Sequence, residues 1–175
     1  MGYTPSHLGH VNIYVRNAEA SRQWYEDVLG LHTYDFLAGR AAFMTANLDE
    51  SHEIALMEVG ADAEGPHKGQ VGLNHMAWRM DSLDNLADFY NNLNDKGVEI
   101  KRVSNHGLSL GIYFEDPEGN VVEVYYKTGF NVKQGFGASI DLETQTDGEI
   151  MAFAKSCEET QGPFQGAKLP VGAAD

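Results

Sequence analysis

Apolar and polar residues alternate along two short stretches of the chain, one after His10 and one after His75. Alternation with a period of two is typical of a β-strand that buries one face. The apolar positions are Val11, Ile13 and Val15 in the first stretch and Met76, Trp78 and Met80 in the second. The intervening residues, beginning with the two histidines, therefore face away from the apolar layer. The residues downstream of the two stretches also match each other, which indicates an internal duplication.

Each alternating stretch is succeeded by apolar residues at spacings of three and four, which predicts an amphipathic helix. Gly30 and Gly97 stand where these helices are expected to end, because glycine readily takes the left-handed conformation of a helix C-terminus. Strand-like runs come after each helix, at residues 31–37, 41–48 and 52–59 in the first copy and 98–103, 108–115 and 120–126 in the second. The chain is therefore predicted to be an α+β protein made of two β-α-β-β-β modules. Their curved mixed sheets, each backed by helices, would turn polar faces toward a shared cleft.

The predicted organisation has a first module at residues 1–65, a second module at residues 66–127 and a C-terminal extension at residues 128–175. In the extension, apolar residues recur at helical spacing after Asp147, which predicts a helix capped by that residue. The final stretch, residues 161–175, is expected to form a loop.

The composition fits a folded protein, since 42% of the residues are apolar and no run approaches the roughly 18 apolar residues of a membrane span. The N-terminus has no basic segment followed by an apolar one, so we expect neither a membrane anchor nor a signal peptide. The single cysteine, Cys157, is incompatible with a disulfide framework or a cysteine-based metal site. A cytoplasmic location is therefore expected.

The formal net charge is −14, from 26 acidic and 12 basic residues spread along the chain. Such a chain repels the phosphates of nucleic acids, so nucleic acid is not expected as a partner, and no membrane is expected either. The same field does not favour an anionic substrate, but it is neutral or favourable toward uncharged and cationic ligands.

Glu123 lies in the apolar run NVVEVYY, where its side chain is expected to be buried. A buried carboxylate costs on the order of several kcal/mol unless it is paired or binds a cation. Two histidines and a carboxylate are the donor set of Fe(II) sites that bind substrate and O₂ at open positions. His10, His75 and Glu123 are therefore candidate metal ligands. A salt bridge of Glu123 with Lys101 or Arg102, and ordinary core or surface roles for the histidines, are the alternatives.

The sequence resembles the vicinal oxygen chelate superfamily over residues 7–127. The matching features are His10 and the motif WYEDVLGL in the first module, and His75, FYNNL and DPEGNVVEVY in the second. Members of this superfamily pair β-α-β-β-β modules around a divalent metal. The resemblance therefore implies a shared metal-binding cleft with His10, His75 and Glu123 as ligands.

The resemblance is greatest to type I extradiol ring-cleaving dioxygenases, which have three protein ligands and a nearby set of two histidines and a tyrosine. The matching positions are His52, His106 and Tyr113. Glyoxalase-like members instead use a second glutamate where this sequence has Ala55, with Glu53 and Glu58 displaced along the strand. Taken singly, each member of the histidine and tyrosine set also fits an ordinary role at a strand end, in a loop or as a half-buried aromatic residue.

This resemblance implies an oxidoreductase that opens the ring of a catechol with O₂ at a non-haem Fe(II) centre, with Mn(II) as the alternative metal. The product would be a semialdehyde, as in the breakdown of aromatic hydrocarbons. His52 would act as acid and base on the O₂ side, whereas His106 and Tyr113 would hydrogen-bond the diol oxygens. We also expect a homo-oligomer. The alternatives on the same scaffold are a metal-dependent glyoxalase-like lyase or isomerase, a thiol transferase, and a non-catalytic drug-binding protein.

Overall fold

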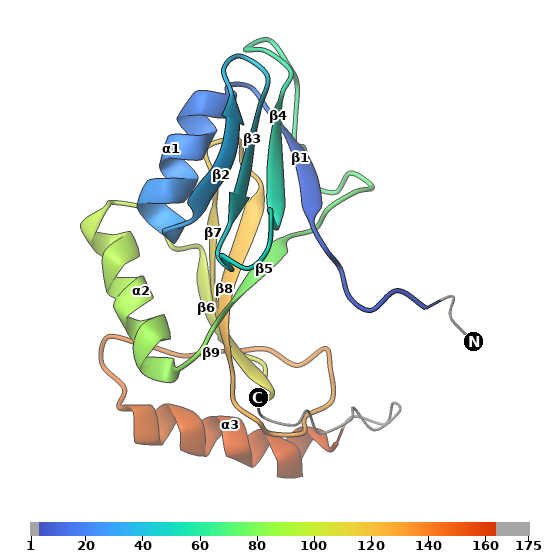
Figure 1. The fold of residues 1–175 in the computed structure, drawn as a ribbon. Coiled ribbons are helices and arrows are strands. Elements are labelled where there is room, and N and C mark those ends of the chain that lie inside the picture. Colours follow the sequence, from blue (N-terminus) through green and yellow to red (C-terminus); the bar gives the residue numbers. More distant parts are fainter. Residues whose placement is uncertain (1–3, 164–175) are drawn as a thin grey trace. The chain divides into compact units, whose positions relative to one another are not determined.

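The computed structural model describes residues 4–163, which divide into two compact units. The first unit holds the chain up to His75 together with Glu115–Val121, and the second holds Met76–Phe114 and the chain from Val122 onward. Each unit is built around one mixed β-sheet (Figure 1). Most of the loop expected at 161–175 lies outside the described residues.

The first unit is a four-stranded sheet with one helix packed against it (Figure 1). Its elements are β1 (Val11–Val15), α1 (Ala18–Leu29), β2 (His32–Leu37), β3 (Ala41–Thr45) and β4 (Ile54–Glu58). The strand order is β1-β4-β3-β2, with β1 parallel to β4 and the other neighbours antiparallel. The alternation predicted for β1 is confirmed, since Ile13 and Val15 are buried whereas Asn12 and Tyr14 are exposed.

The second unit is a five-stranded sheet with two helices. Its elements are β5 (Met76–Met80), α2 (Leu83–Asp95), β6 (Arg102–Asn105), β7 (Ser109–Glu115), β8 (Val121–Lys127), β9 (Ala138–Ser139) and α3 (Asp147–Gln161). The strand order is β5-β8-β7-β6-β9. Strand β5 runs parallel to β8, and β6 runs antiparallel to both β7 and β9.

The predicted fold class is confirmed, because the order β-α-β-β-β occurs twice and both sheets are mixed. The strand predicted at 98–103 is shorter than expected and begins at Arg102. At the start of the predicted strand, the N–H of Val98 instead donates to the carbonyl of Leu93 in the preceding helix, at 2.9 Å. Strand β9, in the C-terminal extension, was not predicted.

Capping residues fix the helix ends. Helix α1 begins after Asn17, whose side chain accepts from the N–H of Ala20, and ends at Gly30 with φ 68°. Asp147 is not the cap of α3, so that prediction is wrong. Thr146 caps this helix instead, by exchanging hydrogen bonds with Glu149 in a capping box.

The turn between β7 and β8 belongs to the first unit and is tied to it by two carboxylates. The Tyr25 hydroxyl donates to Asp116 at 2.8 Å, and Arg16 pairs with Glu118 at 2.6 Å. Gly119 completes the turn with φ 88°, a conformation that other residues rarely adopt. Burial, followed by the charge and hydrogen bond of Asp116, raises the pKa of Tyr25 well above its ordinary value. Tyr25 therefore remains a hydrogen-bond donor.

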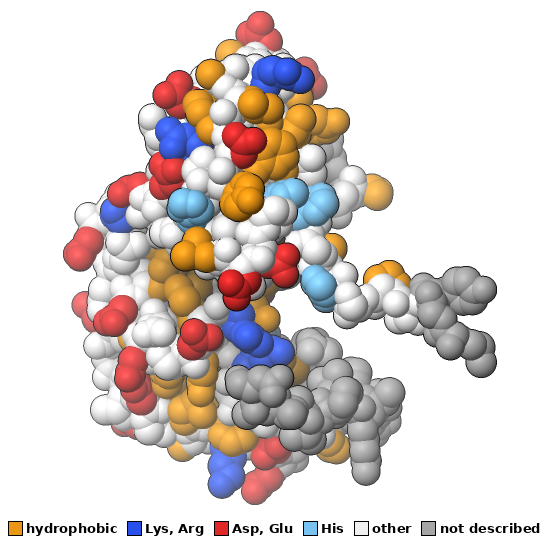
Figure 2. Space-filling view, viewed as in Figure 1, with side chains coloured by type: hydrophobic (Ala, Val, Ile, Leu, Met, Phe, Trp, Pro, Cys, Tyr) orange, Lys and Arg blue, Asp and Glu red, His pale blue; other side chains and the backbone are white. Residues whose placement is uncertain are grey.

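Acidic side chains are scattered over the visible surface in Figure 2 and are not gathered in one patch. This distribution matches the spread of charge along the sequence. None of the helices within residues 4–163 combines the length and the apolar character needed to cross a membrane.

Candidate active site

His10 and His52 lie side by side at one end of the first unit's sheet. The parallel pairing of β1 with β4 places Val11 opposite Ile54, and the N–H of Val11 donates to the carbonyl of Glu53 at 2.9 Å. The residues just before these two strands are therefore neighbours. Their imidazole centroids are 4.4 Å apart, with an angle of 42° between the rings.

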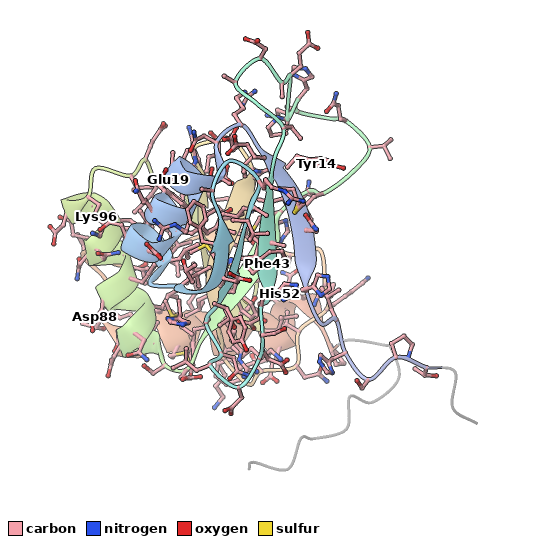
Figure 3. The ribbon with its side chains drawn as sticks, turned by 45° about the horizontal axis from the view of Figure 1, so that its top comes forward. Tyr14, Glu19, Phe43, His52, Asp88 and Lys96 are labelled. Atoms are coloured by element: carbon pink, nitrogen blue, oxygen red, sulfur yellow. The ribbon has the colours of Figure 1, made fainter. Side chains whose placement is uncertain are left out.

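His52 has two further contacts. Its ring meets the ring of Phe43 edge-on, with centroids 5.2 Å apart (Figure 3), and its Nδ1 lies 3.1 Å from the hydroxyl of Ser51. Burial lowers the pKa of His52, and the neighbouring His10 lowers it further. A lowered pKa favours the neutral imidazole, which is the form that can accept a proton.

Both glutamates near Ala55 have hydrogen bonds within the first unit. Glu53 accepts three hydrogen bonds from residues 45–47, at 2.8 to 3.1 Å, and so closes the connection between β3 and β4. Glu58 accepts at 2.9 Å from the N–H of Ala18 at the start of α1. Ala55, between these two residues in the sequence, is buried on β4. The two carboxylates thus stabilise a turn and a helix end.

His75 directly precedes β5 in the sequence and is half-buried. Its Nδ1 lies 2.7 Å from Oδ1 of Asn74. A carboxamide oxygen only accepts hydrogen bonds, so Nδ1 is the donor, and in the neutral ring the lone pair is then on Nε2. A hydrogen bond of this kind is how proteins orient imidazoles that bind metals.

Glu123 is buried within β8, with 7% of its surface exposed. On the neighbouring strand β7, a Cβ added to Gly111 would collide with Oε1 of Glu123 and would lie 3.2 Å from the ring of Tyr113. The glycine therefore leaves open the space that the carboxylate occupies. Glycine inside a strand often marks such a close approach.

Tyr113 connects Glu123 with His106. Its hydroxyl lies within hydrogen-bonding reach of the Glu123 carboxylate and 3.0 Å from Nε2 of His106, and its single hydrogen can be donated to one of these two acceptors at a time. The guanidinium of Arg102 lies 4.0 Å from the centre of the tyrosine ring. Burial raises the pKa of Tyr113 most, and Glu123 raises it further, while Arg102 acts in the opposite direction. The tyrosine is therefore protonated at neutral pH and can donate a hydrogen bond.

The two basic residues considered as salt-bridge partners of Glu123 have contacts of their own. Nζ of Lys101 pairs with Glu99 at 2.8 Å. Arg102 lies over the ring of Tyr113, as a cation on an aromatic face.

His75 thus contacts Asn74, and the other five predicted site residues fall into two groups. These are His10 with His52, and Glu123 with Tyr113 and His106. Within either unit taken by itself, the described residues include no cluster of three His, Cys, Asp or Glu side chains of the kind that binds a metal. Joint coordination of one metal by His10, His75 and Glu123 therefore stays a prediction.

Three positions that support the site were not singled out from the sequence: Asn74, Gly111 and Phe136. Gly111 could have been identified, because glycine interrupts an otherwise apolar strand there. Phe136 accepts a hydrogen bond from His106 Nδ1 through its backbone carbonyl, at 2.6 Å. A backbone contact of this kind leaves no signal in the residue type.

A family model described as the Glyoxalase/Bleomycin resistance protein/Dioxygenase superfamily matches residues 7–124. Biphenyl-2,3-diol 1,2-dioxygenases 2 and 3 of Rhodococcus globerulus are 35% and 36% identical over 124 and 126 residues, which is 71% of this chain and 64% of each relative. A manganese-dependent 2,3-dihydroxybiphenyl 1,2-dioxygenase of Geobacillus genomosp. 3 is 27% identical over 122 residues, or 68% of this chain and 36% of that relative. The chain thus spans less than two thirds of the length of these relatives.

Solved structures share the fold at lower identity. A glyoxylase/bleomycin resistance protein/dioxygenase domain from Frankia sp. EAN1pec has a TM-score of 0.61 at 19% identity, covering 76% of this chain and 96% of that chain. A lactoylglutathione lyase from Agrobacterium tumefaciens has a TM-score of 0.56 at 22% identity, covering 70% of this chain and 94% of that chain. At these identities the likeness shows the fold alone.

Proposed function

Because the chain belongs to the glyoxalase/bleomycin resistance protein/dioxygenase superfamily, we propose that it cleaves a catecholic ring with O₂ beside the two hydroxyl groups. One observation carries the proposal: Tyr113 contacts both Glu123 and His106 within the second unit. A tyrosine and a histidine next to a buried carboxylate suit a reaction that moves protons on a bound diol. The relatives named as biphenyl-2,3-diol dioxygenases support the same reaction class.

The proposed metal ligands are His10, His75 and Glu123. Two imidazoles and one carboxylate suit Fe(II) or Mn(II) and leave coordination positions open. Two features of the chain fit this role: the Glu123 carboxylate occupies a space kept open by Gly111, and Asn74 leaves the lone pair of His75 on Nε2. We favour Fe(II), and the manganese-dependent relative makes Mn(II) the alternative.

When bound, the metal would hold the diol and activate O₂. The proposed work of the chain is to orient the diol and to move its protons. Tyr113 keeps its own proton and can donate a hydrogen bond to a diol oxygen, while His106 can exchange a proton with the tyrosine hydroxyl. His52 favours the neutral form and is proposed to accept and return a proton on the O₂ side. Both atoms of O₂ would enter the ring-opened product, so the reaction needs no external reductant.

A glyoxalase-like lyase or isomerase, a thiol transferase and a drug-binding protein are the other functions considered for this fold. A glyoxalase-like site would use a second glutamate, but Glu53 and Glu58 already accept hydrogen bonds within the first unit. A drug-binding protein would use neither a metal nor the contact between Tyr113 and His106. Stoichiometric iron or manganese after anaerobic purification would therefore contradict the binding function.

The direct test is an anaerobic reconstitution with Fe(II), and separately with Mn(II), followed by the addition of oxygenated catechol or 2,3-dihydroxybiphenyl. We expect consumption of O₂ together with a yellow ring-opened product. Saturating metal without O₂ uptake on either diol would contradict the proposed reaction.

His52→Gln separates the proposed chemistry from simple binding. We expect this variant to retain metal and catechol binding while turnover falls by roughly 10²- to 10⁴-fold, the usual effect of losing a positioned proton donor or acceptor. Glu123→Ala is the contrasting variant, because loss of a ligand should remove the metal and with it both binding and turnover. A His52→Gln protein with wild-type turnover would show that the imidazole has no acid or base role.

A further inference from the structure

The C-terminal extension packs against the loop that carries His106 and is hydrogen-bonded to it. Thr128 donates twice to this loop, from its N–H to the carbonyl of Leu108 at 3.0 Å and from its hydroxyl to the carbonyl of Gly107 at 2.5 Å. The side chain of Val132 lies so close to Gly107 that a Cβ at this position would collide with it. Gly107 also has φ 78°, which favours glycine. The loop and the extension therefore pack closely against each other, with glycine at the point of closest approach.

The extension then joins the sheet at the residues just before His106. Strand β9 pairs with β6, so that Ser104 is opposite Ser139 and Asn105 is opposite Ala138. This pairing fixes the backbone of the preceding residues in the extension. It places the carbonyl of Phe136 2.6 Å from Nδ1 of His106.

Gly137 brings the backbone of the extension against the imidazole itself. A Cβ at Gly137 would lie 3.4 Å from both Nδ1 and Cε1 of His106. A Cβ there would be in van der Waals contact with the ring, so the backbone of the extension lies directly against the imidazole. The ring is thus held between the extension on one side and the Tyr113 hydroxyl on the other, at 3.0 Å from Nε2.

These contacts determine which nitrogen of the neutral imidazole carries the hydrogen. A backbone carbonyl only accepts hydrogen bonds, so Nδ1 must donate to Phe136. In the neutral ring the lone pair is then on Nε2, facing Tyr113. The bond made by one ring nitrogen sets the tautomer and therefore the chemistry of the other.

We propose that the segment Phe136–Gly137 is a positioning element of the active site, which holds His106 as the Nδ1–H tautomer and presents Nε2 to Tyr113. The catalytic consequence rests on the proposed dioxygenase function, whereas the tautomer itself does not. The family match ends at residue 124, so this element lies in a part of the chain that the family model does not describe.

The tautomer can be read from the wild-type protein by ¹⁵N NMR of labelled histidine, at a pH above the ordinary titration range of histidine. The chain has seven histidines, and the His106 signals are assigned by their loss in His106→Gln. We expect a protonated Nδ1 and an unprotonated Nε2 for His106. A hydrogen on Nε2 alone, or rapid exchange between the two tautomers, would overturn the proposal whether or not the protein is a dioxygenase.

Gly137→Val tests the positioning role, because its two methyl groups would extend from a Cβ that is already in contact with the His106 ring. We expect mixed tautomers and a fall in kcat of roughly 10²-fold with little change in KM, because a small misplacement of a reacting group has effects of this size. Gly148→Val is the matched control, because nothing lies within 4 Å of a Cβ added there. Wild-type tautomer and kcat in Gly137→Val would overturn the proposal. Absence of activity in every protein, with the predicted wild-type tautomer, would contradict only the dioxygenase function.

Discussion

The position of the Glu123 carboxylate depends on Gly111, a neighbouring residue that has no side chain. Gly111 leaves open, beside β7, the space that Oε1 of Glu123 occupies, and the Tyr113 hydroxyl lies beside the same carboxylate. The carboxylate of a buried acid that is held in this way is already oriented without a bound metal. Preorganisation of ligands lowers the free-energy cost of binding a metal.

Gly111→Ala should therefore displace Glu123 and weaken the proposed metal site. We expect metal affinity to fall by roughly 10- to 100-fold, the range seen when the residues that orient metal ligands are changed. Titration of the apo-protein with Fe(II) under anaerobic conditions measures this change. Gly148→Ala, whose added Cβ meets nothing within 4 Å, is the control. Unchanged affinity in Gly111→Ala would show that Glu123 does not bind the metal from this position.

Asp116 is a second buried acid, with a structural role. Burial raises its pKa, and the hydrogen bonds from Asn120 and Tyr25 offset this rise only in part. An acid whose pKa is higher in the folded state than in the unfolded state favours folding most when it is protonated in both states. Its contribution is therefore lost as the pH rises through the folded-state pKa.

The comparison of wild type with Asp116→Asn should show this dependence. We expect the free energy of unfolding of the wild type, relative to the variant, to fall between about pH 3 and pH 7, by about 1.4 kcal/mol for each unit by which the pKa is raised. Urea unfolding at a series of pH values measures it, and taking the difference between the two proteins removes the general effect of the acidic surface. A difference that increases with pH would mean that the pKa is lowered in the folded state.

At the scale of elements, apolar residues recurring with a period of two predicted the strands after His10 and His75, and recurrence at a period of about 3.6 predicted both module helices. Together these patterns were enough to predict the order β-α-β-β-β. Gly30 was predicted to end α1 because its conformational freedom is a property of the residue itself. Strand β9 could not be predicted from two residues with no period, since its pairing with β6 depends on distant contacts. The same holds for the candidate site: the resemblance to extradiol dioxygenases indicated His106 and Tyr113, but the carbonyl of Phe136 has no signature in the sequence.

The cap of α3 shows how a neighbouring residue of similar chemistry changes a predicted helix start. Thr146 and Asp147 are both good capping residues, but only Thr146 stands three residues before Glu149 and can form the reciprocal pair. Helix α3 belongs to the same unit as the segment that holds His106. Glu158 of α3 also accepts from the N–H of Asn131, at 2.8 Å, in that extension.

Thr146→Ala should destabilise the protein by about 1 kcal/mol, because the N–H of Glu149 loses its capping partner. Thr160→Ala near the other end of α3 is the control and should change stability by less than about 0.5 kcal/mol. The free energy of unfolding in urea measures both. Equal effects of the two substitutions would indicate that the capping box does not stabilise the helix in solution.

At the scale of the whole molecule, the net charge of −14 affects how any test of metal binding is interpreted. A strongly acidic protein repels itself, and any divalent cation reduces this repulsion without a specific site. A rise in thermal stability on adding metal is therefore not sufficient evidence for the proposed ligands. A hard cation such as Mg²⁺ supplies the same charge but prefers oxygen ligands and water over imidazole.

Fe(II) or Mn(II) should stabilise the protein beyond what Mg²⁺ does at the same concentration. With free metal at about 100 times its dissociation constant, binding to the folded state adds about 2.7 kcal/mol, which for a chain of this size raises Tm by roughly 5–10 °C. We expect this excess to disappear in Glu123→Ala and to persist in His52→Gln, because the first variant loses a proposed ligand and the second does not. Anaerobic thermal unfolding with each cation measures the effect. An excess that survives in Glu123→Ala would place the metal on other residues, and an equal rise with Mg²⁺ would mean that the cations act through charge alone.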